Sequence, residues 1–159
     1  MLTLQSDTLD RICFHAQTEY PGECCGVLLG RREEGQRIAY RIIQTTNSVG
    51  GGKRTMRFQI DPLELAKAEL EAEREQLEIV GFYHSHPNHE AVPSCEDTRC
   101  MIAGYSYPIV SVQHGSCFKV RSYTKARQTD AYAQEESLVK EKRHADFGIC
   151  IGNLANLCE

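Results

Sequence analysis

The feature that most constrains this chain is a short apolar run followed by two histidines that one residue separates. Residues 78–83 are mostly β-branched, aromatic or small, which is typical of a buried strand. Because side chains alternate between the faces of a strand, we expect the next histidines, His84 and His86, to point the same way. Two such imidazoles can bind one metal ion, and Asp97 from the following helix would supply a third ligand. Three N and O ligands leave one zinc position for water, as in catalytic sites.

The length and composition indicate one ordinary globular domain. The chain has 159 residues, of which 41% are hydrophobic and 25% charged, enough to bury a core. A net charge of -4 gives no electrostatic reason to expect nucleic acid as a partner. No apolar run approaches the ~18 residues of a membrane helix, and residues 1–7 do not resemble a signal peptide. We therefore expect a cytoplasmic protein with neither a membrane nor a nucleic-acid partner.

The cysteine content is high for this length, with eight in the chain. No export signal and no Cys-x-x-Cys pair is present, which argues against a disulfide framework. We therefore expect most of these residues to be reduced, small and buried. They are Cys13, Cys24, Cys25, Cys95, Cys100, Cys117, Cys150 and Cys158.

Strand and helix signals alternate along the chain, which predicts an α/β domain with a mixed sheet. A first helix is expected between a Ser6-Asp7 cap and Pro21-Gly22. Strands are predicted at residues 24–30, 37–46, 56–60, 78–83, 108–113 and 117–123, and further helices at residues 61–77 and 95–104. Residues 135–142 fit either a helix or a strand, and the conformation of residues 149–158 stays open.

Each candidate ligand also has an ordinary structural explanation. His84 and His86 could be surface histidines at the end of a strand, although Asp97 favours a metal. Ser94 and Asp97 also fit a helix capping box, in which the serine oxygen accepts from the backbone N–H three residues on. Because one carboxylate cannot readily serve both a cap and a metal, the spacing alone leaves the role of Asp97 open.

A hydrolytic zinc site also needs a general base that accepts a proton from water. No glutamate lies between the two histidines, so the base must come from elsewhere in the chain. Glu23 is the best candidate, because it lies in a turn that leads into an expected core strand. The alternative for Glu23 is a solvated turn carboxylate.

Together these residues resemble the motif of the JAMM (MPN-domain) zinc metalloproteases. That motif is a distant Glu, then His-x-His, seven residues, Ser, two residues and Asp. Glu23, His84, His86, Ser94 and Asp97 fill its positions with this spacing. The similarity includes residues 22–30, 47 and 58–62, and covers roughly residues 1–122.

The resemblance implies a fold and an activity. The fold would be a mixed, curved β-sheet flanked by helices, layered as in cytidine deaminases. Residues 1–122 would form the catalytic core, and residues 123–159 an extension packed on the same domain. The activity would be hydrolysis of the peptide or isopeptide bond after the C-terminal Gly-Gly of a ubiquitin-like or sulfur-carrier protein. The short chain is similar to stand-alone prokaryotic members.

The resemblance also implies a role for each motif residue. One Zn²⁺ would be held by His84, His86 and Asp97, so that Asp97 would not be a cap alone. Glu23 would take a proton from water and pass it to the leaving amine. Ser94 would stabilise the oxyanion of the tetrahedral intermediate.

Other functions stay open beside this one. One is a non-catalytic scaffold domain of the same fold. Such a domain would not need the five motif residues, and their presence argues against it. A zinc amidohydrolase acting on a small molecule is harder to separate by sequence. The thiol of Cys95 could be an oxidation-sensitive bystander or an extra zinc ligand, but we favour simple packing. Residues 123–159 could complete the sheet, mediate a homodimer or cover the active site.

Overall fold

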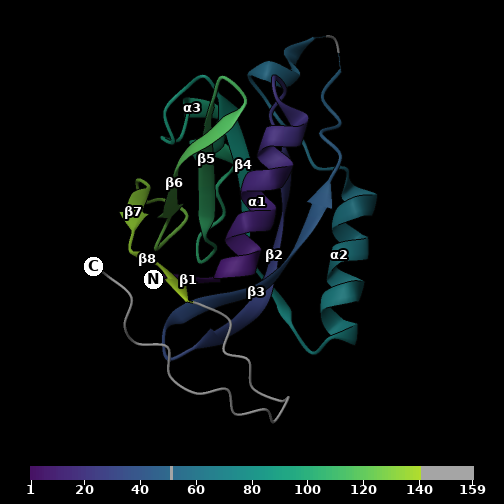
Figure 1. The fold of residues 1–159 in the computed structure, drawn as a ribbon. Coiled ribbons are helices and arrows are strands. Elements are labelled where there is room, and N and C mark those ends of the chain that lie inside the picture. Colours follow the sequence, from purple (N-terminus) through teal and green to yellow (C-terminus); the bar gives the residue numbers. More distant parts are fainter. Residues whose placement is uncertain (51, 141–159) are drawn as a thin grey trace, which may run out of the picture.

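The computed structural model describes residues 1–50 and 52–140 (Figure 1). Within them, eight strands form one mixed sheet in the order β7-β6-β5-β4-β2-β3-β1-β8. The strands are β1 Leu2–Gln5, β2 Cys25–Glu33, β3 Gln36–Thr45, β4 Glu78–Pro87, β5 Tyr107–Gln113, β6 Ser116–Thr124, β7 Ala133–Glu135 and β8 Ser137–Lys140. The helices are α1 Ser6–Glu19, α2 Pro62–Arg74 and α3 Cys95–Cys100, with a 3-10 turn at Lys53–Thr55. The expected α/β class, a mixed sheet flanked by helices, is confirmed.

The two long helices pack on opposite faces of the sheet. Successive residues of a strand face opposite ways, so neighbouring residues of β2 contact different helices. Ile12 of α1 packs in one core cluster with Leu28 of β2. Val27 and Leu29, its neighbours in β2, pack in another cluster with Ala68 of α2. Figure 1 shows α1 lying across the sheet and α2 beside β2 and β3. Residues 25–30 of the central strand β2 are therefore buried on both faces, whereas its last three residues are charged and exposed.

Strand β4 carries the two histidines and lies in the middle of the sheet. It pairs antiparallel with β2 and parallel with β5. The strand continues to Pro87, beyond the predicted end at residue 83, so His84 and His86 are strand residues. Tyr83 faces α1, where its hydroxyl is 2.8 Å from Nδ1 of His15. His84 therefore lies on the face opposite α1.

The predicted strand at residues 56–60 is wrong. Within this segment only Ile60 makes a bridge, to Asn47. The Asn47 side chain instead accepts from the N–H of Gln59 at 3.2 Å and donates to the carbonyl of Arg57 at 2.8 Å. The backbone N–H of Gln59 and the carbonyl of Arg57 are therefore hydrogen-bonded to one side chain rather than to a neighbouring strand.

Two helix boundaries also differ from the predictions. The first helix begins at Ser6, with Gln5 at the N-cap and no side-chain cap, so the predicted Ser6-Asp7 cap is wrong. The preceding strand β1, which was not predicted, runs directly into this helix. The helix predicted at residues 95–104 ends at Cys100. The hydroxyl of Tyr107 bonds both backbone groups of Ile102 and holds the chain out of the helix.

The described part of the C-terminal extension adds strands to the same sheet. β7 pairs with β6, and β8 pairs with β1. Residues 137–140 are therefore strand, where helix or strand had been left open. Residues 149–158 lie outside the described residues, and the predicted domain boundary stays a prediction.

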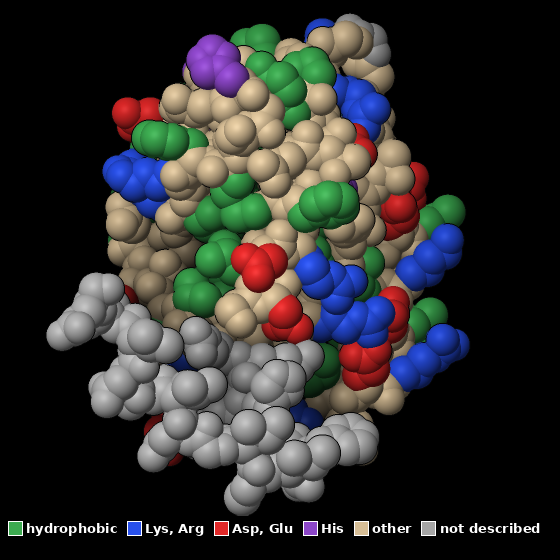
Figure 2. Space-filling model, in the orientation of Figure 1, with side chains coloured by type: hydrophobic (Ala, Val, Ile, Leu, Met, Phe, Trp, Pro, Cys, Tyr) green, Lys and Arg blue, Asp and Glu red, His purple; other side chains and the backbone are tan. Residues whose placement is uncertain are grey.

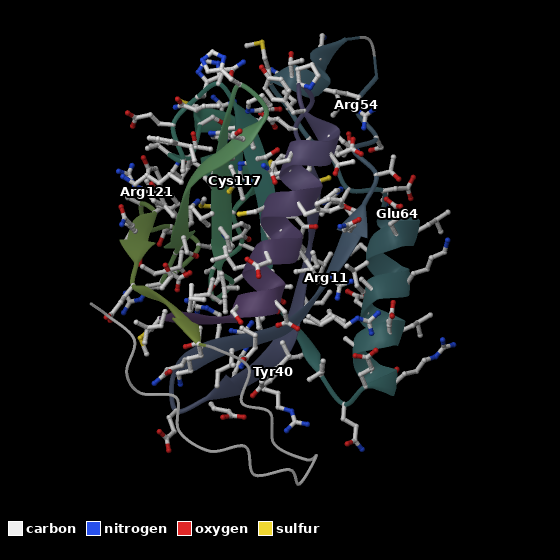
Figure 3. The ribbon with its side chains drawn as sticks, in the orientation of Figure 1. Arg11, Tyr40, Arg54, Glu64, Cys117 and Arg121 are labelled. Atoms are coloured by element: carbon white, nitrogen blue, oxygen red, sulfur yellow. The ribbon has the colours of Figure 1, made fainter. Side chains whose placement is uncertain are left out.

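The cysteines are less buried than expected. Among the described residues only Cys24 and Cys25 are buried, while Cys95 and Cys100 are exposed. Cys117 of β6, labelled in Figure 3, and Cys13 of α1 are only partly buried. The six cysteines in the described part of the chain are Cys13, Cys24, Cys25, Cys95, Cys100 and Cys117, and all six are free thiols.

The surface over α1 and α2 mixes both signs of charge. Figure 2 shows Lys and Arg side chains interspersed with Asp and Glu on this face. Arg41 of β3, for example, forms ion pairs with Glu71 and Glu75 at α2. Over the described residues, the structure contains no helix of the length and apolarity that a bilayer crossing requires.

Candidate metal centre

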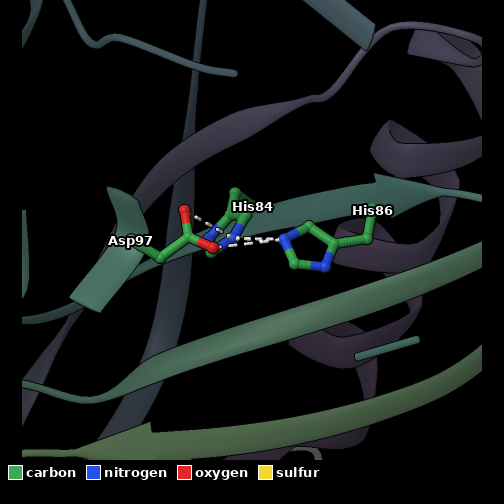
Figure 4. A group of neighbouring side chains, drawn as sticks. All are labelled: His84, His86 and Asp97. Atoms are coloured by element: carbon green, nitrogen blue, oxygen red, sulfur yellow. Dashed lines mark hydrogen bonds and ion pairs between the residues drawn. The ribbon is translucent and has the colours of Figure 1, made fainter. Parts of the chain in front are cut away.

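The two histidines of β4 converge on one point (Figure 4). His84 is 2% exposed and His86 8%, and their Nε2 atoms are 3.1 Å apart. The expectation that both rings point the same way is thereby confirmed. Nδ1 of His86 is 2.9 Å from the carbonyl oxygen of Glu90. A proton on Nδ1 would bond that oxygen and leave the Nε2 lone pair directed into the site.

Asp97 of α3 completes the group. Its Oδ1 is 3.5 Å from Nε2 of His84, and its Oδ2 is 3.4 Å from Nε2 of His86. Asp97 also forms a capping box with Ser94, because Oδ2 accepts from the N–H of Ser94 at 2.7 Å and Ser94 Oγ accepts from the N–H of Asp97 at 3.1 Å. The capping box that the spacing allowed is therefore present, and the carboxylate that forms it also lies near both histidines. Oδ2 bonds the cap, and Oδ1 is left to face a metal.

The donor set fits a metal ion of the zinc type. One ligand atom from each of His84, His86 and Asp97 lies within 4.8 Å of the others, and two imidazoles with one carboxylate are common zinc ligands. Burial lowers the pKa of His84. For Asp97, the contacts with both histidines outweigh burial and lower the pKa of the carboxyl. A neutral imidazole and an ionised carboxylate are the forms that bind metal.

His86 differs from His84 in its electrostatics. Burial lowers its pKa, but the hydrogen bond with Asp97 and the bond to the Glu90 carbonyl outweigh burial, and the net pKa is raised. A metal ion in this position would compete with the proton on the ring. Metal binding to this group is therefore expected to release a proton.

Glu23 is brought to this site from a turn more than sixty residues away in the sequence. The next residue, Cys24, exchanges two hydrogen bonds with Ser85, which lies between the two histidines. Glu23 itself is 5% exposed, so the alternative of a solvated turn carboxylate is wrong. Burial raises the pKa of its carboxyl to about 7, with His86 lowering it and Asp97 raising it through their charges. The hydrogen bonds between Cys24 and Ser85 therefore hold Glu23 next to the strand that carries both histidines.

Three groups that the sequence reading did not assign hold this site together. Asn47 is 5% exposed, and its side-chain amide donates to the backbone carbonyl of Glu23 at 3.0 Å. The N–H of Glu23 donates to the carbonyl of Arg54 at 2.6 Å, in the loop that Figure 3 labels at Arg54. The ring of Phe58 stacks on His84, with 4.5 Å between centroids. Asn47 and Phe58 lay within the family resemblance, but no spacing pattern predicted what they contact.

The remaining motif residue, Ser94, is exposed at the N-cap of α3. Because its Oγ accepts from the backbone of Asp97, its own hydroxyl hydrogen can donate to another group. Its neighbour Cys95 is also exposed and is not part of the metal-binding group. The interpretation of Cys95 as a packed thiol is therefore wrong.

Comparison with known proteins assigns the family. The sequence family of prokaryotic homologs of the JAB domain matches residues 5–124. This chain belongs to that family. The resemblance to the JAMM (MPN-domain) proteins is thereby confirmed, and the match runs from the last residue of β1 to the end of β6.

Individual members of the JAB family show how close the match is. The chain is 32% identical over 117 residues to a desampylase of Haloferax volcanii, covering 69% of this chain and 80% of that protein. It is 31% identical over 138 residues to a CysO-cysteine peptidase of Mycobacterium tuberculosis, covering 86% and 88%. The solution structure of a protein from Desulfitobacterium hafniense superposes with a TM-score of 0.78 at 29% identity, covering 91% and 96%. The named relatives support the expected peptidase class.

Proposed function

We propose that this chain is a zinc-dependent peptidase that hydrolyses the bond after the C-terminal Gly-Gly of a ubiquitin-like or sulfur-carrier protein. The observation that carries the proposal is the convergence of His84, His86 and Asp97, with ligand atoms within 4.8 Å. The buried Glu23 supports it, because the next residue, Cys24, is hydrogen-bonded to Ser85 between the two histidines. Relatives named desampylase and CysO-cysteine peptidase support the substrate class. The bond cleaved would be a peptide or isopeptide bond.

The metal would be held by three side chains of two elements. His84 and His86 would bind through Nε2, because Nδ1 of His86 faces the Glu90 carbonyl. Asp97 would bind through Oδ1, since Oδ2 accepts the cap hydrogen bond. When bound, Zn²⁺ would polarise the substrate carbonyl and lower the pKa of water.

Glu23 would move the proton. It would accept one proton from the attacking water and deliver it to the nitrogen of the leaving amine, so that a glycine carboxylate and a free amine result. Burial raises its pKa to about 7, which suits a group that must both accept and donate a proton near neutral pH. Ser94 would donate its hydroxyl hydrogen to the oxyanion that forms on the scissile carbonyl.

The decisive experiment is a cleavage assay on a sulfur-carrier protein that is extended by a peptide beyond its Gly-Gly. We expect cleavage directly after the glycines, loss of cleavage on addition of a chelator, and recovery on addition of Zn²⁺. Mass spectrometry of the products locates the bond. If protein shown to hold about one zinc cleaves no such substrate, the small-molecule amidohydrolase becomes the better explanation. If the chain binds no zinc at all, the scaffold domain does.

A further inference from the structure

A pocket of about 280 Å³ opens directly beside the metal-binding group. Its volume is far above the ~30 Å³ of one water molecule and close to the lower end of the ~300–1,000 Å³ of small-molecule sites. His84 and Asp97 form part of its wall, whereas neither His86 nor Glu23 does. The pocket therefore adjoins the metal-binding group at His84 and Asp97, and Glu23 is not part of its wall.

The deep wall of the pocket is apolar. It is formed by Phe82 of β4, Tyr107 of β5, Leu65 of α2 and Ile60 of the loop before α2. The rings of Phe82 and Tyr107 stack with 6.0 Å between centroids. The hydroxyl of Tyr107 is occupied by the backbone of Ile102, so only its ring faces an occupant. An apolar surface of this kind gains most from an aliphatic or aromatic side chain.

The rim of the pocket is exposed and partly charged. Met56 and Ile102 line it while 77% and 52% exposed. Across the rim, Arg57 Nε and Glu96 Oε2 form an ion pair at 2.8 Å, which joins the loop before α2 to α3. An occupant would thus enter between these two segments, with an apolar group inside and a polar backbone at the metal-binding end.

We propose that this pocket binds an apolar side chain of the carrier protein, at one of the two residues that precede its terminal Gly-Gly. The proposal rests on the proposed function. Glu23 would protonate the leaving amine, so the amine part of the substrate would lie near Glu23. Because Glu23 does not line the pocket, the pocket would receive the acyl part of the substrate. The two glycines would pass the metal-binding group in extended form, at about 3.3 Å per residue. The first side chain of the tail would then reach the pocket.

The test uses two series of carrier proteins. In the first series the residue directly before Gly-Gly is Leu, Phe, Ala, Ser or Glu, and in the second series the residue one position earlier is varied in the same way. Two quantities are measured for each carrier. The first is the affinity of Gly-Gly-ended carriers for the zinc-loaded E23Q variant, by fluorescence anisotropy. The second is kcat/KM of the wild type for the extended carriers. At one of the two positions, we expect Leu and Phe to exceed Ser and Glu by on the order of 10–100-fold in both quantities.

Matched variants locate the effect in the pocket. Ile102→Asp puts a charge at the rim, and Leu70→Asp puts the same charge on α2 at a leucine that is 56% exposed and outside the pocket lining. We expect I102D to weaken binding of the apolar carriers by about 10-fold while leaving the Ser carrier unchanged, and L70D to change neither. Flat series at both positions, or an equal effect of both variants, would overturn the proposal.

The outcomes separate this proposal from the peptidase activity itself. A residue preference in binding without cleavage of any carrier would support the pocket and remove the proposed function. Binding of no carrier, together with hydrolysis of small amides that bear an apolar group, would overturn the carrier tail as occupant. In that case the pocket belongs to a small-molecule hydrolase.

Discussion

The side-chain amide of Asn47 donates to the backbone carbonyl of Glu23 at 3.0 Å, which ties the end of β3 to the candidate base. The same side chain donates to Arg57 and accepts from Val49 and Gln59. All four hydrogen-bonding positions of the amide group are therefore used. One buried residue thus fixes both Glu23 and the loop that borders the pocket.

Replacing this residue should loosen the site without removing a metal ligand. For Asn47→Ala we expect a loss of about 1–3 kcal/mol in the free energy of unfolding, because buried backbone groups lose their partner. We also expect kcat to fall by on the order of 10-fold while the zinc content stays the same, as Glu23 loses a backbone anchor. Ser48→Ala, which removes an exposed hydroxyl bond to Gln59, is the control. Equal effects of the two variants would contradict a special role for Asn47.

The base can be tested separately from the metal. Glu23→Gln keeps the size and burial of the side chain but cannot take up a proton. We expect zinc to remain bound and turnover to fall by about 10²–10⁴-fold, as measured by metal analysis and the cleavage assay. Glu69→Gln, at an exposed residue of α2 outside the pocket lining, is the control and should stay within a few-fold of wild type. Near-normal turnover of E23Q would remove Glu23 from its assigned role.

A change of one atom can separate the cap formed by Asp97 from its proposed metal ligation. In Asp97→Asn, the remaining side-chain oxygen can still accept from Ser94, so the stability of the metal-free protein should change by less than about 1 kcal/mol. Zinc affinity should fall sharply, because a carboxylate oxygen ligand is lost. Asp97→Ala should lose both the cap and the metal. Thermal unfolding with and without zinc measures both effects, and tight zinc binding by D97N would show that Asp97 is not a ligand.

Metal removal should lower the stability of the folded chain. A ligand that binds only the folded state at about 1,000 times its Kd stabilises by ~4 kcal/mol. For a domain of this size that corresponds to on the order of 10 °C in Tm. We expect a chelator to lower Tm by such an amount in the wild type and to leave Tm of His84→Ala unchanged. An equal shift in both proteins would place the stabilising metal elsewhere.

A pH effect is expected from His15 of α1, which contacts Tyr83 on the sheet face opposite His84. Burial lowers the pKa of His15 below 6.5, partly offset by the charge of Glu19. The unfolded chain therefore takes up a proton at a higher pH than the folded one. Stability should fall as the pH drops below 6.5, by up to about 1.4 kcal/mol per pH unit.

Denaturant unfolding between pH 7 and pH 5 tests this pH effect. His15→Gln keeps a partner for the hydroxyl of Tyr83 and removes the titrating group. We expect the unfolding free energy of H15Q to fall less steeply with acid than that of the wild type. His89→Gln, at an exposed residue, should follow the wild type. If H15Q also follows the wild type, the acid sensitivity has another source.

Much of the site was predictable because its local parts follow short-range rules. The alternation of a strand placed His84 and His86 on one face, and the spacing of Ser94 and Asp97 gave a capping box. Both follow from backbone geometry over a few residues. The helix at α2 was equally clear, with Asp61 at its N-cap and a run of strong helix formers.

The wrong predictions fall where distant partners decide the conformation. Residues 56–60 alternate like a strand, yet the Asn47 side chain satisfies their backbone. β1 is a strand only because β3 and β8 pair with it on either side. Strand propensity depends strongly on such context, so neither outcome could be read from local pattern.

The sequence by itself determined the ligand types, their spacing along β4 and α3, and through the motif the family. Only the tertiary structure decided that Glu23 is buried, that Asp97 forms a cap while it lies near both histidines, and that an apolar pocket adjoins this group. The physical reason is the distance along the chain between the residues that interact. Side-chain direction within one element is set by bonded geometry, whereas burial, pKa and cavities arise from packing between segments far apart in the chain.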